Sequence, residues 1–268
     1  MDISKAAEHV KDLGKFEFPG RVEWKLPTIY GFEVTKYMVL ELAVAAAMIL
    51  IFVPLARRTA SGRPVRGHWA NSFEALLVFL RDEVARPAIG RHDADRFLPF
   101  LWTVFFFVLF CNLAGALPWC GSPTGALAVT GVLAGTTFLT VIVSGMRKFG
   151  PLRFWWGLAP HMDLPWIASI PLRVVLMVLE VLGLLIRHAV LAVRLLANMF
   201  GGHMVLAVVV SFIAAAAGGV FVVWLGVTLG SLAGAAAVSL LEIFVAFLQA
   251  YIFVFLSAVF IGMAVHQH

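Results

Sequence analysis

Long runs of apolar residues, separated by short polar segments, make up most of this chain. The five runs cover about residues 37–56, 97–118, 125–146, 171–212 and 220–265. A helix needs about 20 apolar residues to cross a bilayer, so each run is long enough for a crossing. The pattern predicts an all-α, polytopic membrane protein with five transmembrane helices.

The last two runs are longer than a bilayer requires. At about 1.5 Å per residue, helices over 171–212 and 220–265 would be about 63 and 69 Å long, whereas the hydrocarbon core is about 30 Å thick. Such helices must either break or tilt strongly. Gly183, Gly201 and Gly202 permit a bend without requiring one. We therefore expect a long, steeply tilted hairpin.

A different periodicity occupies residues 69–85, which are too polar to cross a membrane. Five apolar residues recur there on one face of a helix: Phe73, Leu76, Leu77, Leu80 and Val84. Asn71, followed by Glu74 three residues later, would cap the start of this helix. The pattern predicts an interfacial amphipathic helix on the membrane, or equally an amphipathic helix packed on another subunit.

Residues 1–33 are polar, carry balanced charges and lack the apolar segment of a signal peptide. We interpret them as an N-terminal extracytoplasmic segment and residues 34–268 as the membrane domain. The loops 57–96 and 147–165 are rich in Arg and Lys, whereas the turns at 119–124 and 213–219 are uncharged. The positive-inside rule then places the N-terminus outside and the C-terminus in the cytoplasm.

Composition supports this class and narrows the chemistry. Hydrophobic residues make up 62% of the chain and charged residues 13%, about half the average of soluble proteins. Two cysteines define neither a metal site nor a disulfide framework. We find no nucleotide-binding glycine loop, zinc spacing or nucleophile motif, and interpret His266-Gln-His268 as a solvated end rather than a metal site. We therefore expect a non-enzymatic protein without cofactor, metal or nucleic-acid partner.

Arg194 is the most informative residue, because it lies deep in an apolar run of about 40 residues. An arginine inside a bilayer costs roughly 2.5–3.5 kcal/mol on insertion scales. It cannot lose its charge, since its pKa lies above about 12. This cation therefore needs a fixed anionic partner, an anionic substrate, or an anion that arrives and leaves.

Other polar residues on the same run form one stripe with Arg194. Arg173, Glu180 and Arg187 precede it at intervals of seven residues, and Asn198 follows by four. Seven residues is almost two helical turns, so these side chains share a face. Arg173 and Arg187 would extend their charges to the cytoplasmic interface, or belong to the functional stripe.

Two further polar residues lie on the last run. Glu242 and Gln249 are seven residues apart, and the run is antiparallel to its predecessor. If Gln249 is level with Arg194, then Glu242 lies near His203, about 13 Å further outward than Arg194. Such a His–Glu pair is a plausible proton relay. The alternative is a buried salt bridge that only locks the hairpin.

Titratable groups therefore occur on both sides of the arginine. Glu180 is about 21 Å from Arg194 on the cytoplasmic side, opposite to His203 and Glu242. Arginine cannot pass a proton on, so the pattern indicates two half-channels separated by a cation. Asn112, in the second run, either lines the outer half-channel or only binds backbone.

Four segments resemble the subunit a family of the F-type ATP synthase membrane sector. They are Arg194-Leu-Leu-Ala-Asn-Met-Phe-Gly-Gly-His203, Leu248-Gln-Ala-Tyr-Ile-Phe253, Arg57-Arg-Thr-Ala-Ser-Gly62 and Cys111-Asn-Leu-Ala-Gly-Ala-Leu-Pro118. The resemblance covers about residues 30–268. It implies a proton-conducting stator subunit of a bacterial inner membrane, next to peripheral-stalk subunits and a rotor ring whose small subunits each carry a mid-membrane carboxylate.

The resemblance also implies roles for residues. Arg194 would face the ring, Asn198 and Gln249 would support that interface, and His203 and Glu242 would serve the outer half-channel. Glu180 would serve the inner one. In many family members the acid and the histidine at positions 203 and 242 are exchanged, and some bacterial members have an acid where Gly115 stands.

Two other interpretations compete with this one. A secondary transporter would use Arg194 to bind an anionic substrate, but it predicts internal repeats, which the sequence lacks. A purely structural anchor leaves the placement of Arg194, His203 and Glu242 unexplained. The coupling ion, proton or sodium, depends on the ring subunit.

Overall fold

The computed structural model describes residues 15–18, 22–25, 28–29, 32–60, 67–116, 122–157 and 166–266. The side chains of residues 15–33, 60, 166–171 and 203 lie outside this description. Within it, five helices are long and apolar enough to cross a membrane, which confirms the predicted number of spans.

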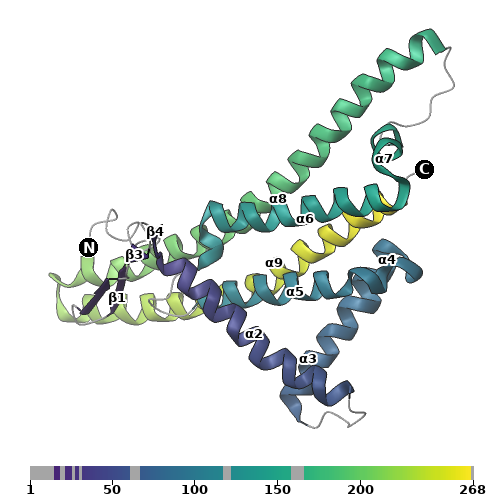
Figure 1. The fold of residues 1–268 in the computed structure, drawn as a ribbon. Helices are drawn as coiled ribbons and strands as arrows, with labels where there is room; N and C mark the ends of the chain where they lie inside the picture. The colour runs from purple at the N-terminus through teal and green to yellow at the C-terminus, as the bar shows by residue number, and fades with distance from the viewer. Residues whose placement is uncertain are drawn as a thin grey trace. The chain divides into compact units, whose positions relative to one another are not determined.

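These five helices dominate the fold (Figure 1). They are α2 (Lys36–Ala60), α5 (Arg91–Gly115), α6 (Leu127–Phe149), α8 (Trp166–Ala216) and α9 (Phe221–Val265). Basic residues occupy the last turns of α2 and α6, where they complement the negative end of each helix dipole. Helix α5 begins at Arg91, six residues before the apolar run. Gly90 separates α5 from the preceding helix, and its φ of 92° is a conformation that favours glycine.

Helices α8 and α9 are continuous over 51 and 45 residues, or about 77 and 68 Å. The α8 helix runs through Gly183, Gly201 and Gly202 without a break. This continuity favours tilt over breakage as the means of fitting the hairpin into a bilayer. The tilt itself stays a prediction.

Four short strands lie in the segment that precedes α2. Strand β1 (Lys15–Phe18) pairs antiparallel with β2 (Val22–Lys25), and β3 (Thr28–Ile29) pairs antiparallel with β4 (Phe32–Glu33). The sequence predicted no element here, because each strand has only two to four residues and gives little periodicity. The division of the chain near residue 33 stays a prediction.

The amphipathic helix is present as α3 (His68–Phe79), a π-helical turn η1 (Leu80–Ala85) and α4 (Arg86–Ile89). The proposed cap at Asn71 is wrong, because the helix begins at His68 with Gly67 as its N-cap and has no side-chain cap bond. Of the predicted apolar face, Leu80 and Val84 are completely buried. The end of this helix therefore packs within its own chain.

Two short helices occupy segments that the sequence left as a loop or a turn. Helix α7 (Pro151–Gly157) follows Gly150, and the 3₁₀ helix η2 (Pro123–Gly125) precedes α6. Both begin with proline, whose fixed φ suits the first helical position. A helix of seven residues, such as α7, shows too little periodicity to be recognised from sequence.

The chain forms two compact units. The first comprises Met1–Pro64, Phe106–Thr130 and Arg194–Ala250, and the second Val65–Phe105, Gly131–Val193 and Tyr251–His268. The first unit thus holds α2 and the part of the hairpin from Arg194 to Ala250. The second holds α3, η1, α4, most of α6 and the other end of the hairpin.

In the second unit, the C-terminal end of α9 packs closely on α4. Gly262 contacts the backbone of Ala88, whose carbonyl carbon would lie 3.0 Å from a Cβ at position 262. The His266 Nε2 lies 2.6 Å from the Ile89 carbonyl oxygen. His266 is exposed, as we expect of a solvated end, and its ring also bonds to the last turn of α4. Residues 267 and 268 lie outside the described residues.

Charged residues of the second unit form ion pairs on its surface. Arg81 pairs with Asp95 at 3.2 Å, and Lys148 pairs with Asp93 at 2.6 Å. The side-chain hydrogen bonds to Asp95 raise the pKa of Arg81 above its ordinary value. These residues come from the segments that the charge pattern assigned to the cytoplasmic side.

Candidate functional site

Three helices of the first unit surround a cavity of about 300 Å³. Helices α5, α8 and α9 and the residue after α5 line it with Asn112, Gly115, Ala116, Ala197, Asn198, Met199, Gly201, Gly202, Val205, Val238, Leu241, Glu242 and Val245. Apolar side chains predominate, and Asn112, Asn198 and Glu242 supply the polar groups. A mostly apolar pocket with a few convergent polar groups is typical of a functional site.

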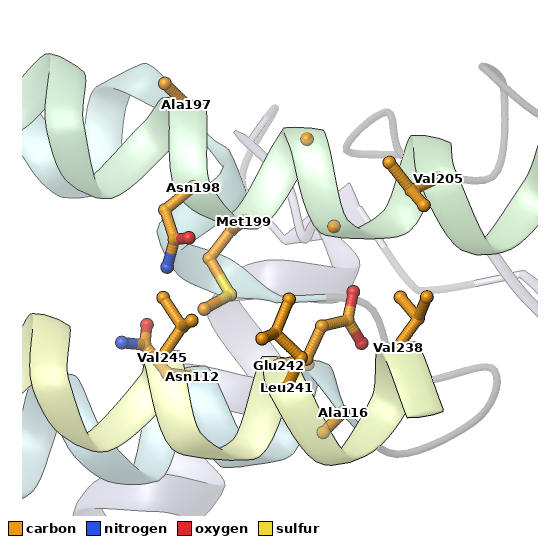
Figure 2. A pocket seen from close by; sticks show the side chains of 13 residues that line it. Asn112, Ala116, Ala197, Asn198, Met199, Val205, Val238, Leu241, Glu242 and Val245 are labelled. Atoms are coloured by element: carbon orange, nitrogen blue, oxygen red, sulfur yellow. The ribbon is translucent and has the colours of Figure 1, made fainter. Parts of the chain in front are cut away.

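Among the described residues that line the cavity, Glu242 alone carries a charge. Figure 2 shows its carboxylate extending from α9 toward α8. There it contacts Gly202: a Cβ at position 202 would lie 3.0 Å from Glu242 Cδ and 3.2 Å from its Cγ. The glycine therefore makes room for the carboxylate against the α8 backbone.

Two contacts define the register of α8 and α9 in this unit. Gly202 faces Glu242, and Gly234 faces Val209 with 3.6 Å between a Cβ at 234 and Val209 Cγ1. The seven residues from Gly202 to Val209 on α8 are matched by the eight residues from Gly234 to Glu242 on α9. Continued toward the first residue of the unit on α8, this register brings Arg194 near the level of Gln249, the condition under which the spacing placed Glu242 near His203.

Arg194 lies on an exposed face of α8. Asn198, Gly201 and Val205 follow it by four, seven and eleven residues, and all three line the cavity. This spacing places the four residues along one helical face. The arginine therefore stands at the end of the stripe that leads into the cavity.

Gln249 is almost fully buried, with 4% of its surface exposed. Within the described residues, its Nε2 has no hydrogen-bond partner. Leaving a buried amide donor unpaired costs roughly 1–3 kcal/mol. The unpaired Gln249 amide therefore lowers the stability of the fold, and a functional role near Arg194 would explain why it is kept.

Asn112 binds backbone, one of the two alternatives that the sequence left open, and its place in the outer half-channel stays a prediction. It lines the cavity, and its Nδ2 donates a 3.4 Å hydrogen bond to the Ala246 carbonyl on α9. Its Oδ1 accepts a 2.7 Å hydrogen bond from Thr124. Only 1% of Asn112 is exposed, so these bonds satisfy an amide that would be costly to bury alone.

Glu180 lies in the second unit and has a different environment. Its Oε1 is 3.5 Å from Arg187 Nη1, and both side chains are 42% exposed. The guanidinium lies along the helix past Gly183, where a Cβ would be 4.0 Å from Arg187 Nη2. Arg187 therefore reaches back to Glu180. The position of its charge at the cytoplasmic interface stays a prediction.

The structure brings some predicted site residues together and leaves one undescribed. Asn112, Asn198 and Glu242 meet at the cavity, whereas Glu180 is in the other unit. The His203 side chain lies outside the described residues, so its pairing with Glu242 stays a prediction. No group of three potential metal ligands occurs among the residues that the structure describes.

The sequence analysis did not predict the structural roles of four residues in and near the cavity and in the second unit. Gly202, Ser122 and Thr124 support the cavity residues, and His188 fills the core of the second unit. The His188 ring lies 5.3 Å from the Phe138 ring and 4.9 Å from that of Phe260. The double glycine and the Ser-Pro-Thr turn were visible signals, but only the packing assigns them partners.

The chain matches the family described as ATP synthase A chain over residues 38–262. It is 38% identical over 265 residues to ATP synthase subunit a of Myxococcus xanthus, covering 94% of this chain and 79% of that protein. It is 38% identical over 272 residues to ATP synthase subunit a of Chloroherpeton thalassium, covering 97% and 76%. With ATP synthase subunit a of Anaeromyxobacter dehalogenans it shares 37% identity over 281 residues, covering 97% and 70%.

Proposed function

Because the chain belongs to the ATP synthase A chain family, we propose that it is the proton-translocating stator subunit of an ATP synthase membrane sector. It conducts ions and performs no bond chemistry itself. Its five membrane-long helices fit a multi-pass component of such a complex. Proton flow through it would be coupled to rotation and to ATP synthesis elsewhere in the complex.

The exposed Arg194 is the single observation that carries this proposal. A permanent cation on an exposed face of a membrane-long helix needs an anion from outside the chain. A rotor ring with mid-membrane carboxylates supplies one that arrives and leaves. Arg194 attracts each carboxylate as it loses its proton and blocks direct proton leakage, because arginine does not deprotonate.

We propose that the cavity belongs to the outer half-channel, at its end nearest to Arg194. Its residues on α8 lie beyond Arg194 in the direction that the charge pattern assigns to the outside. Glu242 provides a titratable group there, with His203 as its expected partner. Asn198 and Gln249 support the arginine from α8 and α9.

The inner half-channel is proposed to pass Glu180. This carboxylate precedes Arg194 by 14 residues on α8, about 21 Å along the helix axis. It is partly exposed, so protons from the cytoplasmic side can reach it. The N-terminus would lie outside, the C-terminus in the cytoplasm of a bacterium, and peripheral-stalk subunits would hold the protein against rotation.

The sidedness of the cavity gives a direct test. In a background with Cys111→Ala and Cys120→Ser, Ala116→Cys places a thiol on the cavity wall. A membrane-impermeant thiol reagent should inhibit ATP-driven proton pumping when it is added from the outer face only. Leu229→Cys, at a 60% exposed apolar position on α9, is the matched control and should stay uninhibited.

Two results would contradict the proposal. Inhibition from the cytoplasmic face alone would reverse the assigned direction of the cavity. Pumping that stays complete after full modification of the cysteine at 116 would remove the cavity from the proton path.

A further inference from the structure

Three polar side chains are buried together where α5 ends and the α6 segment begins. Asn112, Ser122 and Thr124 are 1%, 2% and 0% exposed. Burying polar groups is costly unless each finds a hydrogen-bond partner. Their placement in the first unit, beside the cavity, therefore requires a complete set of hydrogen bonds.

The hydrogen bonds of this group run in one direction. Thr124 has a single hydroxyl proton and donates it to Asn112 Oδ1 at 2.7 Å. In its 2.6 Å contact with Ser122, Thr124 must then accept. Ser122 Oγ also lies 3.3 Å from the Cys111 carbonyl oxygen, so the Ser122 hydroxyl proton is shared between Thr124 Oγ1 and this carbonyl. The two hydroxyls thus form a chain that ends on the amide of Asn112.

This chain determines which way the Asn112 amide points. Its oxygen is held by Thr124, so its NH₂ group must face the other way and donates to the Ala246 carbonyl on α9. Ala246 lies one helical turn beyond Glu242. The orientation of Asn112 therefore affects the wall of the cavity next to the Glu242 carboxylate.

Gly115 makes the arrangement sterically possible. A Cβ at position 115 would overlap the Ser122 side chain and would lie 3.1 Å from Ser122 Cα. Any side chain at this position would displace Ser122 from its place. The glycine and the buried serine are thus two parts of one packing solution.

We propose that Ser122 and Thr124 are positioning residues of the outer proton path, which hold the Asn112 amide with its NH₂ toward α9 beside Glu242. This inference rests on the proposed function of the cavity. Neither hydroxyl is required to carry a proton, because the chain ends on an amide. Their contribution is to keep one orientation of the amide populated.

The test is ATP-driven proton pumping by the whole complex in inverted membrane vesicles. Thr124→Val keeps the shape of the side chain and leaves Asn112 Oδ1 unpaired, so we expect pumping to fall roughly five- to tenfold. Thr124→Ser restores the donor and should recover most of the rate. Thr130→Val is the matched control, since Thr130 is also 0% exposed but bonds only to carbonyls of its own segment.

A double variant tests whether the effect passes through Asn112. Asn112→Ala should reduce pumping by itself, and Thr124→Val should add nothing in that background. Additive losses would overturn the positioning role, as would full pumping by Thr124→Val or no recovery by Thr124→Ser. If Thr124→Val prevents assembly, Ser122→Ala is tested instead. This variant keeps the bond from Thr124 to Asn112, so we expect it to reduce pumping by a smaller factor. Unchanged pumping by Ser122→Ala would then overturn the inference.

The failure of the proposed function has a different signature. Full pumping by Asn112→Ala would show that the cavity wall does not serve the proton path at all. Reduced pumping by Asn112→Ala together with full pumping by Thr124→Val would leave the cavity in place and reject only the positioning role.

Discussion

Glu242 and Glu180 are two carboxylates proposed for the two half-channels, and their surroundings differ in kind. Glu242 extends from α9 to the backbone of α8 at Gly202, in a cavity that three helices build. Glu180 pairs with Arg187 of its own helix. The outer carboxylate therefore depends on tertiary packing, whereas the inner one depends on the local geometry of a single helix.

This difference predicts how each site responds to change. A site made by three helices is sensitive to the volume of every wall residue, because interiors are closely packed. A partly exposed pair on one helix tolerates change, since solvent screens it and exposed pairs contribute little. The following variants test the contrast, and Arg194→Ala has the largest expected effect.

Arg194→Ala should abolish ATP-driven proton pumping, because no other group would attract the rotor carboxylate between the two half-channels. The complex should still assemble, since Arg194 is exposed and does not fill the core. Vesicle pumping together with subunit composition of the purified complex checks this. Normal pumping by the variant would show that Arg194 is not the barrier between the two half-channels.

Gly202→Ala should reduce pumping at least fivefold, because a methyl group there overlaps the Glu242 carboxylate and overpacking is costly. Gly230→Ala is the control, since a Cβ at position 230 meets nothing within 4 Å. The pumping rates of both variants in vesicles decide the matter. Equal pumping rates of Gly202→Ala and Gly230→Ala would mean that the close packing around Glu242 does not affect proton pumping.

The exchange His203→Glu with Glu242→His tests whether these two residues act as one unit. We expect the double variant to retain more pumping than either single change, because the pair of groups is preserved. Residues that interact give non-additive effects. Simple additivity of the two losses would argue against a coupled pair.

Glu180→Gln should lower pumping roughly tenfold if this carboxylate transfers protons. Arg187→Gln should lower it by no more than about fivefold, because the ion pair is exposed. In the Glu180→Gln background, Arg187→Gln should have no further effect. A loss from Arg187→Gln that persists in that background would give the arginine a role of its own.

Much of the fold followed from hydropathy, but several elements did not. All five spans were predicted, because each helix must satisfy its backbone within an apolar run. The strands, α7 and the π-helical turn were missed, since short elements carry too little periodicity. The cap at Asn71 was wrong because Gly67 already begins the helix.

The candidate site divides in the same way. If Gln249 is level with Arg194, the seven-residue spacing and the antiparallel direction are enough to predict that Glu242 lies near position 203. Helical geometry is regular, so such levels can be calculated from residue numbers. The partners of Asn112 could not be predicted, because they come from a turn whose path depends on packing.

The sequence by itself determined the class of protein, the number of membrane-long helices and the residues with chemical potential, above all Arg194. These depend on local hydropathy and on the period of a helix. Only the tertiary structure decided that Gly202 receives Glu242, that Gly115 admits Ser122 and that Arg187 pairs with Glu180. Such contacts arise from close packing between or along helices, where the absence of one methyl group determines what fits.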